Sequence, residues 1–265
     1  MFSDSRGGAA AGGARPCRLA LLAALPLEVR PFLRRVKARR LQGVGLPAWE
    51  FSLGEGRGVL ALTGMGEEAA AAAAEGAVAL WQPRILVSLG FSGALLPGLA
   101  PGHLVLGESF RHYDPQNGRL EEVAAPAPPR PLAALAAQLT TAGLPAALGS
   151  CVTTPGILHK GRQGGPLRPL PQPVLDLETA ALAAVAGAAG IPFLALRVIT
   201  DTGGEEIPDF IREGWEPGYG PGLTKAMGWL AGDPRRLGAM LHLWRRSALA
   251  AARLAAALRV LLPLI

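Results

Sequence analysis

The sequence of 265 residues has little of several features that mark particular classes of protein. Its only two cysteines, Cys17 and Cys151, cannot form a disulfide scaffold or a four-cysteine zinc site. No apolar run reaches the roughly 20 residues that a bilayer-spanning helix needs. Charged residues make up only 17% and hydrophobic residues 50%, which excludes wholesale disorder and supplies a large core. We therefore expect a protein of a reducing compartment, the cytoplasm.

Lysine is also scarce, although the formal net charge is +6. Lys37, Lys160 and Lys225 are the only lysines, so 23 of the 26 basic residues are arginine. Together with 35 glycines and 24 prolines, this profile is typical of a compositional bias. No basic run has interleaved aromatic residues on which bases could stack. We therefore expect no nucleic-acid partner.

Familiar cofactor and hydrolase motifs are missing as well. The sequence has no GxGxxG, no GxxxxGK[ST] and no GxSxG. Its four histidines are scattered and fall into no HExxH or Cys/His spacing. We therefore expect neither a bound metal nor an organic cofactor.

Apolar runs alternate with helical patterns along most of the chain. Residues 1–16 are small and glycine-rich and predict a disordered tail, which leaves a single domain over 17–265. Buried strands are expected at 18–25, 58–63, 85–89, 103–107, 147–153 and 193–199, and helices at 27–36, 67–81, 132–142, 176–189 and 235–260. This order predicts an α/β fold of three layers, with a mostly parallel twisted central sheet flanked by helices. Ligands of such sheets bind beyond the carboxyl ends of the strands.

Three acids stand at these predicted strand ends or helix starts: Glu28, Glu178 and Asp201. Each also has an ordinary explanation, because acids favour the first turn of a helix and cap the segment that follows a strand. Asp176 is similarly a plausible N-cap for the helix at 176–189. Arg197 interrupts an apolar strand, so we expect its guanidinium to pair with a nearby carboxylate. The residue types alone do not decide between catalytic and structural roles for the acids.

Their surroundings are more specific. Val174–Ala181 reads Val-Leu-Asp-Leu-Glu-Thr-Ala-Ala, and Pro192–Asp201 reads Pro-Phe-Leu-Ala-Leu-Arg-Val-Ile-Thr-Asp. With Ala23–Val29, Thr63–Gly66, Ser88–Leu95, Pro101–Val105 and Arg111–Asp114, these segments occur in an order that resembles the nucleoside phosphorylase and nucleosidase family. Within that family, the chain resembles the methylthioadenosine/S-adenosylhomocysteine nucleosidases. The resemblance covers residues 18–201, and the closing helix also fits.

The resemblance implies cleavage of a purine N-glycosidic bond. Asp201 would then protonate N7 of the leaving base, Glu28 would deprotonate the attacking water, and Glu178 would bind the ribose 2′- and 3′-hydroxyls. Residues expected to contact the sugar, the base or the nucleophile are Leu177, Ile157, Leu158, Gly90, Phe91 and Ser92. The base loop at 153–158 and Phe91 depart from the nucleosidase pattern, and residues 203–222 are a candidate lid.

Two alternatives to a nucleosidase stay open. A phosphorylase of the hopanoid-associated subgroup would take adenine from adenosylhopane, with inorganic phosphate as co-substrate. Ser88 stands where hexameric phosphorylases have a phosphate-binding arginine, and Glu28 would repel phosphate, so water is favoured. A non-catalytic nucleoside-binding domain is expected to have lost its acids. The resemblance also implies a homo-oligomer, and we expect the closing helix to pack on the core rather than on a membrane surface.

Overall fold

The computed structural model describes residues 17–54, 56–212 and 235–265, with only the helical backbone of 235–237. The tail predicted at 1–16 and the second half of the candidate lid lie outside the described residues. The strands are β1 (Cys17–Ala23), β2 (Ala38–Arg40), β3 (Ala48–Leu53), β4 (Gly56–Leu62), β5 (Leu86–Ala94), β6 (Leu104–Asp114), β7 (Arg119–Val123), β8 (Ala146–Thr153), β9 (Val174–Asp176) and β10 (Phe193–Asp201). The helices are α1 (Pro26–Leu33), α2 (Glu67–Trp81), α3 (Leu132–Thr141), α4 (Lys160–Gln163), the 3₁₀ turn η1 (Gly165–Leu167), α5 (Thr179–Ala189), α6 (Asp209–Arg212) and α8 (Arg235–Leu261).

All ten strands belong to one sheet with the order β10-β6-β8-β9-β5-β1-β4-β3-β2, and β7 pairs with β6. Strand β10 also pairs with β5, so β5, β10, β6, β8 and β9 form a closed circuit. The neighbours β4, β1, β5 and β10 are parallel, whereas β2, β3, β7 and β9 add antiparallel pairs. The predicted α/β class is confirmed, and the sheet is mixed.

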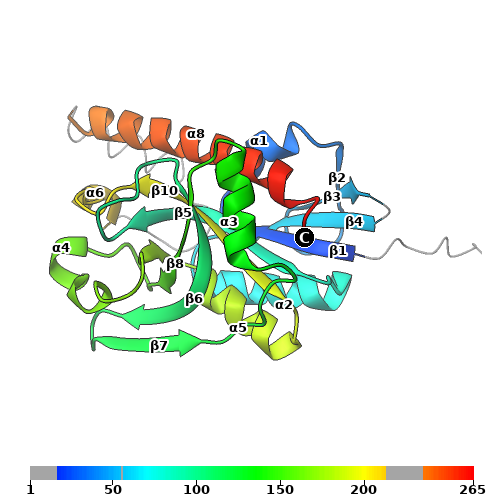
Figure 1. Cartoon of the computed structure of the whole chain (residues 1–265), viewed down its shortest axis with the longest axis horizontal. Helices are drawn as coiled ribbons and strands as arrows, with labels where there is room; N and C mark the ends of the chain where they lie inside the picture. The colour runs from blue at the N-terminus through cyan, green and yellow to red at the C-terminus, as the bar shows by residue number, and fades with distance from the viewer. Residues whose placement is uncertain (1–16, 55, 213–234) are drawn as a thin grey trace, which may run out of the picture.

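Helices cover both faces of this sheet (Figure 1). Helices α1, α3 and α8 pack on one face, where Phe32, Leu135 and Leu254 join one apolar cluster. Helices α2 and α5 pack together on the other face, where Ala74 and Leu182 belong to a second cluster. The buried face of α8 shows that the closing helix packs on the core as predicted. No helix among the described residues is long and apolar enough to cross a membrane.

The structure differs from the predicted elements where polar or glycine-rich residues lie in strands. Strand β5 continues through Gly90–Gly93, because these residues pair with β10. Asp176 ends strand β9 and does not occupy the N-cap of α5, which is Glu178. The predicted loop at 155–173 contains α4 and η1. Strands β2, β3, β7 and β9 were not expected: β2 and β9 have three residues each, β7 is largely polar, and β3 was missed although four of its six residues are apolar.

Candidate active site

A cavity of about 210 Å³ lies at the carboxyl ends of β1, β5, β8, β9 and β10. This is the edge of the sheet at which a ligand is expected. All predicted site residues but one line it: Glu28, Phe91, Ser92, Ile157, Leu158, Leu177, Glu178 and Asp201. The fold thus brings together residues from five separate segments of the chain.

Gly90 is the exception, because it lies in β5 and does not line the cavity. A Cβ atom at this position would lie 2.5 Å from Nη1 of Arg197 and 3.1 Å from Oε1 of Glu28. The missing side chain therefore leaves room for these two charged groups to approach the strand. Gly90 acts on the site by the space it leaves and not by contact.

Glu28 lies in the first turn of α1 and is only 4% exposed. Its Oε2 accepts a hydrogen bond of 2.8 Å from the backbone N–H of Leu25, and its Oε1 accepts one of 3.0 Å from the backbone N–H of Phe91. Burial raises the pKa of Glu28, and these hydrogen bonds oppose that effect. The two hydrogen bonds therefore fix the orientation of the carboxyl group, and its raised pKa makes it a stronger proton acceptor than an exposed carboxylate.

Glu178 lies at the junction of β9 and α5 and reaches the start of α2. Its Oε1 accepts a hydrogen bond of 3.0 Å from the backbone N–H of Gly66. Burial raises the pKa of Glu178 to about 8, and the neighbouring carboxylate of Asp176 adds to the shift. At neutral pH this carboxyl group is therefore mostly protonated.

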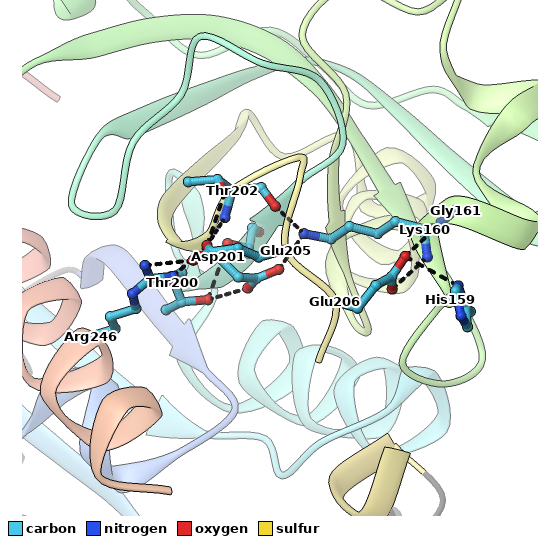
Figure 2. Close-up of polar contacts among 10 residues, drawn as sticks. His159, Lys160, Gly161, Thr200, Asp201, Thr202, Glu205, Glu206 and Arg246 are labelled. Atoms are coloured by element: carbon cyan, nitrogen blue, oxygen red, sulfur yellow. Dashed lines mark hydrogen bonds and ion pairs between the residues drawn. The ribbon is translucent and has the colours of Figure 1, made fainter. Parts of the chain in front are cut away.

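Asp201 ends strand β10 and is 5% exposed. Its Oδ2 lies 2.5 Å from Nζ of Lys160, and its Oδ1 accepts a hydrogen bond of 2.8 Å from Oγ1 of Thr200 (Figure 2). Lys160 is itself buried and lines the same cavity. A Cβ atom on Gly93 would lie 2.5 Å from Oδ2 of Asp201, so that glycine gives the carboxylate its space.

Arg197 and Asp176 form the floor beneath these acids. Nε of Arg197 lies 3.2 Å from Oδ2 of Asp176, and both side chains are at most 2% exposed. Nη2 of Arg197 also donates a hydrogen bond of 2.5 Å to Oγ of Ser88. The pairing predicted for Arg197 is confirmed, and Asp176 supplies the carboxylate. Ser88 points to this network and not to a ligand.

Apolar side chains form the rest of the wall, among them Met65, Phe91, Ile157 and Leu177. Oγ of Ser92 is buried at this wall and has no hydrogen-bond partner among the described residues. A buried hydroxyl without a partner is costly, so a polar group of a ligand or a water is expected to bind it. The cavity suits a flat apolar ligand with a few polar edges.

Sequence reasoning missed Lys160, because it lies in a stretch predicted as loop. The one available signal was its rarity, as lysine accounts for only three of 26 basic residues. Nothing local shows that it folds onto Asp201, which follows 41 residues later.

Comparisons with known proteins find relatives in sequence and in fold. The family model described as "Phosphorylase superfamily" matches residues 18–214. The 5'-methylthioadenosine/S-adenosylhomocysteine nucleosidase of Geobacillus thermodenitrificans is 28% identical over 210 residues, which are 71% of this chain and 86% of the relative. The corresponding nucleosidase of Baumannia cicadellinicola is 27% identical over 154 residues, 54% of this chain and 67% of the relative.

Solved structures show the same fold at lower identity. The nucleosidase of Neisseria meningitidis in complex with methylthio-immucillin-A aligns with a TM-score of 0.69 and 17% identity, covering 94% of this chain and 99% of that one. A futalosine hydrolase mutant of Helicobacter pylori aligns with a TM-score of 0.69 and 14% identity, covering 94% and 100%.

Proposed function

Because the chain belongs to the phosphorylase superfamily, we propose that it hydrolyses the N-glycosidic bond of an adenine nucleoside of the methylthioadenosine/S-adenosylhomocysteine type. The observation that carries this proposal is the meeting of Glu28, Glu178 and Asp201 around one cavity. They come from α1, the β9–α5 junction and the end of β10. Their different environments suit different tasks.

The reaction passes through a sugar with oxocarbenium character while negative charge develops on the base. In our proposal Glu28 orients a water and takes its proton, and the water oxygen bonds to C1′ as the C1′–N9 bond breaks. Asp201 delivers a proton to N7, which neutralises the departing base. Glu178 binds the ribose hydroxyls, while Leu177 packs on the sugar and Ile157 and Leu158 contact the base.

Water is favoured over phosphate as the nucleophile. Among the described residues that line the cavity there is no arginine, the residue that best clamps a phosphate. The carboxylate of Glu28 would repel a phosphate dianion. In our proposal the buried hydroxyl of Ser92, which has no partner among the described residues and lines the same cavity as Glu28, also binds the attacking water. No cofactor enters this mechanism.

Incubation with methylthioadenosine, S-adenosylhomocysteine, inosine and adenosylhopane, each with and without phosphate, tests the proposal. Chromatography follows free base and distinguishes a free sugar from a sugar 1-phosphate. Adenine release without phosphate supports the nucleosidase. Strict phosphate dependence would instead establish a phosphorylase. Binding without base release from any substrate would establish a nucleoside-binding domain.

We also propose a cytoplasmic homo-oligomer. The thiols of Cys17 and Cys151 are both free and buried, which fits a reducing compartment. The oligomer rests on the family resemblance alone. Size-exclusion chromatography with light scattering measures its mass, and a monomer at micromolar concentration would contradict it.

A further inference from the structure

The Lys160–Asp201 pair raises a question about where the acid proton resides. Asp201 receives an ammonium at Oδ2 and a hydroxyl at Oδ1, so both of its oxygens accept hydrogen bonds. Because each oxygen already accepts a hydrogen bond, neither is placed to donate a proton to a base. The base nevertheless needs a proton to leave. Among the described residues, the two groups that donate to Asp201 are the ammonium of Lys160 and the hydroxyl of Thr200, and an ammonium is by far the stronger acid of the two.

We propose that Lys160 is the proton-donating partner of Asp201, and that these two residues together form the acid that releases the base. This inference rests on the proposed function. It adds a residue that lies outside the matched motifs and that the sequence reading did not include.

The local structure fixes Lys160 for this role. Its ammonium donates to Asp201 and, at 2.8 Å, to the backbone carbonyl of Thr202. Its own backbone is held by Glu206, whose Oε2 accepts from the N–H of Lys160 at 3.0 Å and whose Oε1 accepts from the N–H of Gly161 at 2.7 Å. The side chain of Lys160 is therefore anchored at both ends (Figure 2).

The segment that follows Asp201 is anchored to α8 as well. Both oxygens of Glu205 accept from the guanidinium of Arg246, at 2.5 and 2.8 Å, and Oε2 of Glu205 also accepts from the backbone N–H of Thr202 at 2.8 Å. Residues 202–206 thus fix the position of the Lys160 ammonium beside the carboxylate of Asp201. An ion pair formed by chance on the surface would lack these supporting hydrogen bonds.

The proposed step balances in protons and electrons. When substrate displaces water, the low dielectric favours a neutral pair over an ion pair, so a proton moves from Nζ of Lys160 to Oδ2 of Asp201. The carboxylic acid then protonates N7 as the C1′–N9 electron pair moves to the base. Glu28 meanwhile holds the proton taken from water, and solvent returns it to the neutral amine of Lys160 after product release.

Two variants test the proposal against a purely electrostatic role. Lys160→Met removes the proton and the charge, and Lys160→Arg keeps the charge and the ion pair but does not release a proton. We expect both to lower kcat by at least about 100-fold, the usual scale for a lost acid, with KM changed less than tenfold. The exposed Lys37→Met is the matched control and should keep wild-type kcat. Thermal unfolding checks that each variant folds.

Chemical rescue supplies a second readout. Lys160→Ala leaves space for a small amine, and methylamine or ethylamine should restore part of the lost turnover, with a rate that varies with the basicity of the amine. Wild-type kcat in Lys160→Arg, or a Lys160→Met variant that keeps a third or more of wild-type kcat, would overturn the proposal. Release of no base by the wild-type protein would overturn the proposed function, and this inference with it.

Discussion

Arg197 and Asp176 form an ion pair that is almost completely shielded from solvent, with Nε of the arginine 3.2 Å from Oδ2 of the aspartate. The pair joins β10 to β9 directly below the cavity. Asp176 also accepts from the backbone N–H of Thr179 at 2.9 Å and from Oγ1 of Thr153 at 2.7 Å. The floor of the site is therefore a hydrogen-bonded network rather than an apolar core.

Removal of one partner of this ion pair should destabilise the folded protein, because it leaves the other charge buried without compensation. We expect Arg197→Met to lower the free energy of unfolding by about 3–5 kcal/mol in urea titrations. The control is Arg39→Met. Arg39 is 73% exposed and pairs with Glu50 at 3.3 Å, so its loss should cost about 0–1 kcal/mol. Equal losses in the two variants would contradict a structural role for the buried pair.

The contact between Gly93 and Asp201 gives a second prediction. In Gly93→Ala the new Cβ would meet Oδ2 of Asp201 at 2.5 Å, so the carboxylate must move. We expect kcat to fall by about 100-fold, because displacement of a catalytic group by about 1 Å has an effect of this size. Steady-state kinetics of adenine release measures it.

Gly204→Ala is the matched control for this substitution. It lies three residues beyond Asp201 and is exposed, and a Cβ atom there meets nothing within 4 Å. The variant should keep wild-type kcat. If Gly93→Ala is as active as Gly204→Ala, Asp201 is not confined as the structure indicates.

Much of this arrangement could be predicted from local sequence, for physical reasons. The helix expected at 67–81 has the bounds of α2, because Gly66 and two acids mark its start. The core of β10 was predicted because Phe193–Ile199 is apolar but for Arg197. Strands such as β2 and β9 have three residues each and carry no periodicity to detect.

For the site, the positions of the acids could be predicted from sequence, but their hydrogen-bond partners could not. Glu28 and Asp201 stand next to apolar strands, so their place at the edge of the sheet follows from the topology. The partners of these acids depend on long-range folding. Lys160 reaches Asp201 across 41 residues, and Glu178 meets Gly66 across 112. No local pattern specifies such contacts, and only the resemblance linked the acids in advance.

Glu28 should be required for turnover and also contributes to stability. In Glu28→Gln the amide cannot act as a base, and its NH₂ group would face a backbone N–H of Leu25 or Phe91. We expect kcat to fall by about 10²–10⁴-fold and the free energy of unfolding to fall by about 1–3 kcal/mol. Kinetics and urea titration measure the two effects. Exposed Glu68→Gln should change neither, and an active Glu28→Gln would remove Glu28 from the mechanism.

The raised pKa of Glu178 predicts a pH dependence of stability with a definite sign. The folded protein holds this proton up to about pH 8, whereas the unfolded chain releases it near the ordinary value of 4.5. Between these values the folded state binds more protons, so the free energy of unfolding should fall as the pH rises. Glu28, whose pKa is also raised, acts in the same direction. The pKa of Glu205 is lowered to about 2, so Glu205 acts in the opposite direction and mainly below this window.

Urea titrations of wild-type protein and Glu178→Gln from pH 5 to pH 8 measure this effect. The variant should lose part of the decline, because its amide does not titrate, and should retain the part that Glu28 contributes. Glu68→Gln should decline as the wild type does. Parallel curves for wild type and Glu178→Gln would mean that Glu178 is ionised at neutral pH. An ionised Glu178 would bind the ribose hydroxyls as a hydrogen-bond acceptor only.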